Sequence, residues 1–310
     1  MKSSTFFSAA VVATMALAQR PSNISMCDYY TTALLKNNTA ENQYTLLTLV
    51  VNTAVIGNYT MPNVGIAVPG ILAKGMYNGT EVNLLPYFNG GLASSNRGNS
   101  KGVAINFLDG GGAEPLMMNK PANDITSHQF KLLTHLYQYF GYLLGCSMYG
   151  GMGFPSYMGH GSQGQVHKFM ALDPFQVGYF ITQVGLSAAS FGVTDEDVMT
   201  VGTALAKIFD VRCAPNTTVI PEQGPQPQSI CQDESCPLSP NDTCAAYMPE
   251  PEPVAVNATL AMGEGRNVTN ATSTIMNPSS SSMIPSTGAG SLMTQSMGLL
   301  GSIVLLALAL

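Results

Sequence analysis

The sequence predicts a mostly α-helical body followed by a stalk without a core of its own, and three observations support this. Apolar residues recur at helical spacing in several stretches between residues 39 and 210, behind residues that can cap a helix. Residues 60–122 are rich in glycine and asparagine, which is typical of long loops between helices. From residue 246 the chain turns to proline, serine and threonine, which cannot bury enough apolar surface to fold.

The clearest helix is predicted to begin at Thr126. Thr126 and Gln129 have the spacing of a capping box, in which each side chain accepts a hydrogen bond from the other residue's backbone N–H. The apolar positions that follow are Leu132, Leu133, Leu136, Tyr137, Phe140, Leu143 and Leu144. Their spacing of three and four predicts one apolar helix face.

Three more helices have recognisable starts. Asp173 precedes Pro174, so a capping residue stands before a proline at the first helical position. Thr194 with Asp197 predicts another helix start, where consecutive carboxylates complement the helix dipole rather than form a catalytic pair. Residues 39–57 carry the apolar positions Leu46, Leu47, Leu49, Val50, Val51 and Val55, and we expect a helix there despite several β-branched residues.

The first 18 residues are typical of a secretory signal peptide. Lys2 precedes an uncharged apolar run over residues 6–18, which ends in Ala16-Leu17-Ala18. The run is shorter than the roughly 20 residues that a spanning helix needs. We therefore expect cleavage before Gln19 and export of the chain.

The other end is typical of a glycosylphosphatidylinositol (GPI) anchor signal. Small residues Ser286-Thr287-Gly288 precede an uncharged spacer and an apolar run over Met297–Leu310. Ser286 is the predicted attachment site, with Gly288 or a serine of the 279–282 run as alternatives. Residues 287–310 would then be removed as a propeptide.

These signals divide the chain into a signal peptide (1–18), a body (19–245), a glycosylated stalk (246–286) and an anchor propeptide (287–310). The predicted location is the outer face of the plasma membrane or the cell wall. The membrane would be contacted through the anchor lipid, and cell-wall polysaccharide is a further candidate partner.

Cysteines and glycosylation sequons agree with export. The six cysteines are Cys27, Cys146, Cys213, Cys231, Cys236 and Cys244, and we expect all of them in disulfides of unknown pairing. The nine sequon asparagines are Asn23, Asn37, Asn58, Asn78, Asn216, Asn241, Asn257, Asn267 and Asn270.

Composition and motifs limit the function classes. A net charge of −6 with only 12 lysines and arginines excludes a nucleic-acid binder on electrostatic grounds. No serine-hydrolase, zinc-protease, P-loop or dinucleotide motif occurs. We therefore expect a protein that is not an enzyme, although a site built from scattered residues stays open.

One succession of motifs carries a family resemblance. A helix ending in Leu144-Gly145-Cys146 is followed by Tyr157-Met158-Gly159, by His167, and by an apolar helix over 174–191 before the last helix. This order resembles a truncated (2-on-2) globin, over about residues 27–210 if the first helices are included. The arrangement of export signal, helical domain, stalk and anchor resembles fungal-type cell-surface proteins.

The globin resemblance implies a globin-like helical bundle and haem as its cofactor. By that resemblance His167 would be the proximal ligand of the haem iron, while Gln138 and Thr134 would occupy distal positions. The functions it implies are oxygen or redox sensing, or haem capture, at the cell surface. The alternatives are a structural or adhesive cell-wall glycoprotein without a cofactor, in which His167 is an ordinary core or surface histidine.

The anchor signal generates a first prediction. Phosphatidylinositol-specific phospholipase C should release the native protein from membranes, because a GPI lipid is its only predicted attachment. Mass spectrometry of the mature chain should find no peptide from Met297–Leu310. Detection of that tail in the mature protein would contradict the anchor.

Overall fold

The computed structural model describes residues 19–61, 63–247 and 252–262. The predicted signal peptide, the attachment site Ser286, the propeptide 287–310 and the sequons at Asn267 and Asn270 lie outside these residues, as does most of the predicted stalk. Within the described part of the chain, no helix has the length and hydropathy required to span a bilayer.

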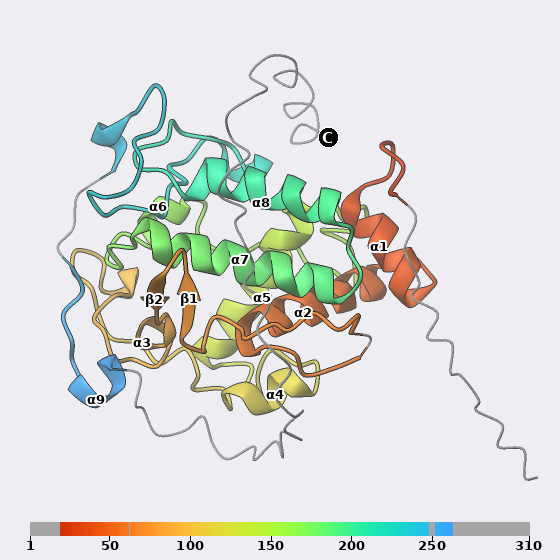
Figure 1. The fold of residues 1–310 in the computed structure, drawn as a ribbon, viewed down its shortest axis with the longest axis horizontal. Helices are drawn as coiled ribbons and strands as arrows, with labels where there is room; N and C mark the ends of the chain where they lie inside the picture. Colours follow the sequence, from red (N-terminus) through yellow and green to blue (C-terminus); the bar gives the residue numbers. More distant parts are fainter. Residues whose placement is uncertain (1–18, 62, 248–251, 263–310) are drawn as a thin grey trace, which may run out of the picture. The chain divides into compact units, whose positions relative to one another are not determined.

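The body is mostly α-helical, as the sequence predicts (Figure 1). The five longer helices are α1 (Met26–Leu35), α2 (Ala40–Ile56), α5 (His128–Leu143), α7 (Pro174–Ser190) and α8 (Asp195–Phe209). The short ones are α3 (Leu85–Phe88), α4 (Ala113–Met117), α6 (Gln163–Val166) and α9 (Ala258–Ala261), with 3-10 turns η1 (Asn96–Gly98), η2 (Pro221–Gln223) and η3 (Cys244–Ala246). A hairpin of β1 (Gly75–Tyr77) and β2 (Thr80–Val82) completes the regular structure.

The predicted helix starts are confirmed for α2, α7 and α8. The side chains of Thr39 and Thr194 accept hydrogen bonds from backbone N–H groups of the first turn. Asp173 forms a full capping box with Gln176, and Pro174 occupies the first turn. These caps satisfy backbone donors that a helix leaves unpaired, so they locate its start.

The predicted cap of α5 is wrong by one residue. Ser127, not Thr126, accepts the hydrogen bond from the Phe130 N–H, since the Thr126 hydroxyl is bonded to the Asp124 carboxylate. Gln129 bonds the backbone of Gly112 instead of closing a capping box. The neighbouring Asp124 engages Thr126, and the loop at Gly112 engages the Gln129 side chain, so the predicted capping box does not form.

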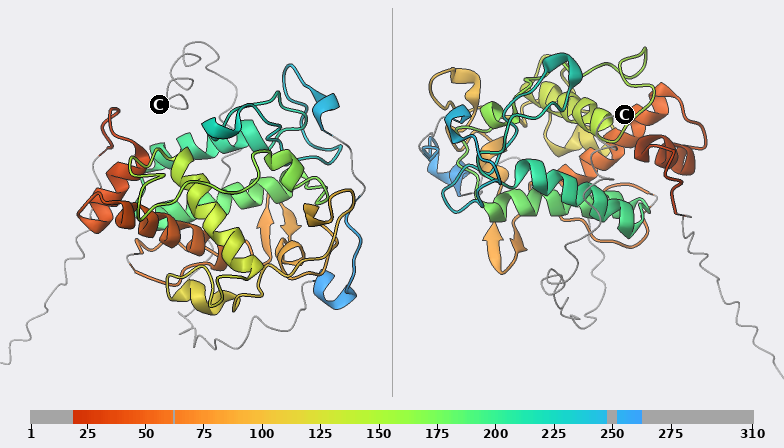
Figure 2. Two further views of the ribbon diagram at one scale, coloured as in Figure 1. Left: turned by 180° about the vertical axis from the view of Figure 1, so that it is seen from behind. Right: turned by 90° about the horizontal axis from the view of Figure 1, so that it is seen from above.

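Helix α2 lies at the centre of the packing. It contacts α1, α5 and α7, and α7 in turn contacts α8 (Figure 2). Its polar side chains find partners inside the body: the Tyr137 hydroxyl donates to Asn52 Oδ1 at 2.6 Å, and Asn52 Nδ2 donates to the Leu116 carbonyl. Buried polar groups without such bonds would cost stability, so these pairs also fix which helices meet.

The region 60–122 is loop-rich as predicted, but it also contains the β1–β2 hairpin and short helices. The hairpin packs against α7 because two glycines permit close approach. A Cβ at Gly178 would overlap the Tyr77 ring, and one at Gly75 would overlap the Tyr179 ring. The hairpin thereby covers part of α7 that would otherwise face solvent.

All six cysteines form disulfides, which confirms the expected oxidised framework. The pairs are Cys27–Cys146, Cys213–Cys244 and Cys231–Cys236. The first joins α1 to the end of α5, across 119 residues of sequence, and the other two lie in the helix-poor region after α8. Disulfides stabilise such a region, where little regular structure is present.

Residues 252–262 differ from the expectation of a stalk beginning at 246. This segment forms backbone hydrogen bonds with the loop at residues 91–93, at Val254 and Val256, and ends in α9. The Asn89 side chain also donates to the Leu260 carbonyl. Backbone hydrogen bonds do not require an apolar sequence, so the composition of residues 252–262 does not predict this contact.

Two helical glycines generate a prediction about stability. In α5, a methyl group at Gly141 would overlap the ring of Phe154, which is fully buried. Gly141→Ala should therefore lower the free energy of unfolding by about 1–3 kcal/mol.

Gly202 in α8 is the matched control. A methyl group added there would have no neighbour closer than 4.0 Å, so Gly202→Ala should raise the free energy of unfolding by about 0.5–1 kcal/mol. Chemical denaturation measures both, and a Gly141→Ala protein as stable as wild type would contradict the packing.

Candidate functional site

His167, the predicted haem ligand, lies at the C-terminal end of α6. Its Nδ1 is 2.9 Å from the Gln163 carbonyl oxygen, one turn earlier. Burial lowers the pKa of His167, so the neutral ring is favoured. The hydrogen bond orients the imidazole and leaves Nε2 without a protein partner among the described residues, a common arrangement for a ligating histidine.

Thr134 and Gln138 lie on α5. The Thr134 hydroxyl donates to the Phe130 carbonyl of its own helix at 2.8 Å. Gln138 is 7% exposed, and its Oε1 has no hydrogen-bond partner. No hydrogen bond among the described residues joins either side chain to His167.

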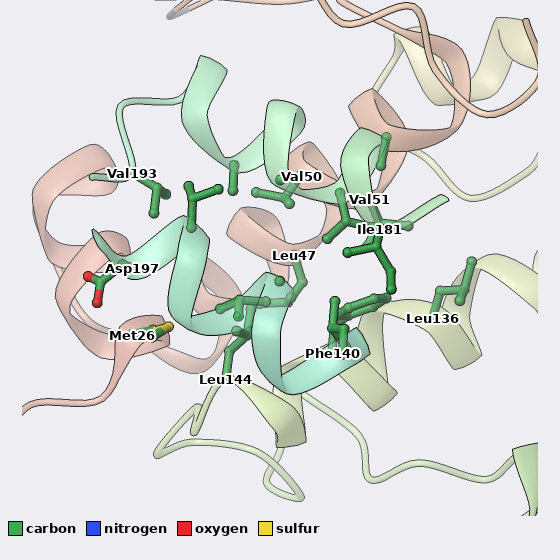
Figure 3. A pocket seen from close by; sticks show the side chains of 18 of the residues that line it. Met26, Leu47, Val50, Val51, Leu136, Phe140, Leu144, Ile181, Val193 and Asp197 are labelled. Carbon is green, nitrogen blue, oxygen red and sulfur yellow. The ribbon is translucent and has the colours of Figure 1, made fainter. Parts of the chain in front are cut away.

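An apolar concavity lies between the long helices, and we call it the inter-helix groove (Figure 3). α5 contributes Leu136, Phe140 and Leu144, and α8 contributes Val198, Val201 and Leu205. α2 and α7 contribute further lining residues, namely Leu47, Val50 and Val51 from α2 and Phe180, Ile181 and Val184 from α7. α5 and α8 share no extended contact with each other, which leaves the space between their apolar faces.

Gln138 cannot reach this groove from its position on α5. Each helical residue turns by roughly 100°, so Gln138 lies about 200° from Leu136, on the opposite side of the helix. The groove is also small, with a volume of about 80 Å³. For comparison, an engineered apolar cavity that binds benzene has a volume of roughly 150 Å³. With no histidine in its lining, the groove does not fit haem.

One end of the groove is polar. Figure 3 shows Asp197 there, beside Met26 and Val193, with Leu136 near the other end. The Asp197 carboxylate receives hydrogen bonds from Arg20 Nη2 at 3.0 Å and from the Tyr30 hydroxyl at 2.7 Å. This end therefore places one ion pair next to an otherwise aliphatic wall.

A second concavity, which we call the acidic cleft, has a volume of about 290 Å³. Asp173, Asp233 and Glu252 line it, together with Tyr87 and Gln176. Burial raises the pKa of Tyr87 to about 12, although Gln176 donates a hydrogen bond to its oxygen. Ser235 also lines the cleft, and its hydroxyl donates a hydrogen bond to the Asp233 carboxylate. In the described part of the chain, no group of three or more histidine, cysteine, aspartate or glutamate residues is arranged to bind a metal ion.

Every sequon asparagine within the described residues is exposed. These are Asn23, Asn37, Asn58, Asn78, Asn216, Asn241 and Asn257. None lies between residues 79 and 215, the stretch that contains α5, α7 and α8. Glycans on the accessible positions would leave these helices uncovered.

The sequence alone predicts only part of the groove lining. The sequence predicts one apolar face for α5, and Leu136, Phe140 and Leu144 of that face line the groove. Arg20 carries no sequence signal, since its partner Asp197 is 177 residues away. Comparison with protein-family models, with curated proteins and with solved structures finds no match.

Asp210, at the end of α8 near the acidic cleft, generates a prediction about pH. Burial, and next the Asp173 carboxylate, raise its pKa to about 6. Because the unfolded chain titrates near 3.9, the folded state holds this proton more tightly. The stability that Asp210 contributes is therefore complete below about pH 4 and is lost as the pH rises through 6.

The test compares wild type with Asp210→Asn by chemical denaturation at several pH values. The variant should gain stability relative to wild type between about pH 4 and 7, since asparagine has no charge to bury. Histidine titrations are common to both proteins and cancel in the difference. The exposed Asp195→Asn variant controls for the loss of one negative charge. A difference between wild type and Asp210→Asn that does not change with pH would contradict the assignment.

Proposed function

We propose that this protein is an exported surface glycoprotein whose helical body binds the alkyl chain of an amphiphile in the inter-helix groove. The observation that supports this is the lining, in which five helices supply aliphatic side chains and one end carries an ion pair. Binding sites for apolar small molecules have this composition, with few polar groups that orient the ligand.

The dimensions favour a thin, extended ligand. Leu136 and Leu144 are eight residues apart on α5, so the groove extends for roughly 12 Å along that helix. A peptide helix, about 10 Å in diameter, is too wide for a space of 80 Å³, and aromatic rings need a larger cavity. An unbranched alkyl chain is the narrowest apolar group, so it is the ligand that a narrow apolar groove favours.

The polar end suggests how an amphiphile would lie. Asp197 lines this end of the groove and pairs with Arg20, and the exposed Glu196 beside it accepts a hydrogen bond from Gln19 at 2.7 Å. A polar head group would lie there in water and near these charges, with its chain directed toward Leu136. The reverse orientation would place the head group against aliphatic side chains without hydrogen-bond partners, which is costly.

The surroundings support an extracellular role. Three disulfides suit an oxidising compartment, and the exposed sequons suit glycosylation. Attachment through a GPI lipid at Ser286 is part of the proposal and rests on the sequence alone. It would hold the groove close to a membrane, where amphiphiles are abundant.

Haem capture by a globin-like domain is the second candidate. The orientation of His167 by the Gln163 carbonyl is the observation that favours it. It requires a haem pocket distinct from the groove. Saturable haemin binding that His167→Ala abolishes would support this candidate, and a wild type without such binding would remove it.

The alkyl-chain proposal predicts a chain-length series. Linear alkanols of increasing length should displace the fluorescent polyene parinaric acid from the protein. Their affinity should rise roughly fourfold for each methylene group, because burying one contributes about 0.8 kcal/mol. It should stop rising once the chain exceeds the groove. No displacement, or a rise without a plateau as in micelle-like adsorption, would contradict the groove.

Two variants on α8 locate the binding. Val201 lines the groove, and Val201→Trp should fill it and weaken parinaric acid binding at least tenfold. Met199 is 65% exposed two residues earlier, so Met199→Trp adds the same side chain outside the groove and should bind normally. Equal affinities of the two variants would place the ligand elsewhere.

A further inference from the structure

Carboxylates gather at the polar end of the inter-helix groove. Asp195, Glu196 and Asp197 occupy the first turn of α8, and Asp28 lies in the first turn of α1. Asp197 lines the groove itself, while Asp195 and Glu196 are exposed beside it. Each of the four is within one helical turn, about 5.4 Å, of a residue that lines the groove. This end of the groove is therefore acidic.

The lysines of the same helices stand at the other end. Lys207 follows Asp197 by ten residues on α8, which places it roughly 15 Å further along the helix axis. Lys131 precedes Leu136 on α5, and Leu136 lies near the opposite end of the groove (Figure 3). α1, α2 and α7 contain no lysine or arginine. The charge along the groove is therefore unequal, with the negative charge beside Asp197.

Arg20 supplies a cation at the acidic end, but its guanidinium is already occupied. Nε and Nη2 donate to the Asp197 carboxylate at 3.1 Å and 3.0 Å, and Nη1 donates to the Ile24 carbonyl. The two paired side chains are only 18% and 8% exposed. An anionic head group would have to break these bonds to reach the guanidinium. That exchange is costly, because it leaves the buried Asp197 carboxylate without its counter-charge.

The helix dipoles of α1 and α8 do not reverse this balance. Each N-terminus contributes about half a positive charge, and the carboxylates of the first turns already complement it. The side chains of Ser25 and Thr194 also accept hydrogen bonds from N–H groups of these turns. A free α-amine at Gln19, created if the predicted signal peptide is removed, adds one positive charge and leaves the four carboxylates in excess.

We propose that the inter-helix groove selects amphiphiles with a cationic head group, such as a long-chain alkyl ammonium, over fatty-acid anions. This inference rests on the proposed function and names the class of amphiphile. The Asp197 oxygens already accept from Arg20 and Tyr30, so the head group is attracted by charge and forms no hydrogen bond there. Neutral and anionic chains still enter, since burial of the chain is common to all three classes, but they bind less tightly.

The test compares three ligands with the same ten-carbon chain, namely decyltrimethylammonium, decanol and decanoate. Calorimetry measures their binding to the intact protein below their micelle concentrations, at about pH 7.5, where decanoate is ionised. At about 10 mM salt, where charges act over roughly 30 Å, decyltrimethylammonium should bind at least about fivefold more tightly than decanoate, with decanol between them. At about 1 M salt, where this length is roughly 3 Å, the ratio of the two affinities should fall toward one.

Matched variants assign the selectivity to the acidic end. Asp195→Asn with Glu196→Gln should lower the ratio of decyltrimethylammonium to decanoate affinity at least about twofold and leave decanol binding unchanged, because only charge is removed. The control combines Glu81→Gln with Glu234→Gln, which removes two carboxylates that are exposed and do not line the groove. It should keep the wild-type ratio. Thermal unfolding of both double variants shows whether the fold is retained.

Three results would overturn the cationic preference. They are decanoate that binds as tightly as decyltrimethylammonium at low salt, an affinity ratio that salt does not change, and equal changes of the ratio in the two double variants. Decanol binding in any of these cases leaves the alkyl-chain proposal standing, because decanol carries no charge. If none of the three ligands binds, both the groove and its selectivity are refuted.

Discussion

The burial of α2 is the constraint on which the rest of the structure depends. Ten of its residues are buried, and they include the polar side chains of Gln43, Thr48, Asn52 and Thr53. A helix that is apolar on nearly all sides must be covered on all of them. α1, α5 and α7 do this, and the hydrogen bond between Asn52 and Tyr137 fixes the position of α5 against α2.

The same constraint creates the inter-helix groove. α5 is held by α2 and α8 is held by α7, so the two outer helices present apolar faces to each other without closing the space between them. Closing it would require α5 or α8 to leave its own partner. The Arg20–Asp197 ion pair and the Cys27–Cys146 disulfide then hold α1 across one end. An unfilled apolar space costs stability, and an alkyl chain would recover part of that cost.

Aromatic contacts and disulfides order the loops of this structure. The segment from Ser147 to His160 is irregular, yet Phe154, Tyr149 and Tyr157 anchor it through ring contacts and one backbone bond. The region after α8 depends in a similar way on Cys213–Cys244 and Cys231–Cys236.

The sequence by itself determined the features that depend on neighbouring residues. Asp173-Pro174 and Thr194 mark helix starts because a cap and its backbone partner are three residues apart. The oxidised state of the cysteines likewise followed from their even number and the export signal. The tertiary structure decided the Cys27–Cys146 pairing, the docking of residues 252–262 and the groove with its Arg20–Asp197 end. These depend on which surfaces meet after the chain folds, and the spacing of neighbouring residues does not predict contacts between positions 119 or 177 residues apart.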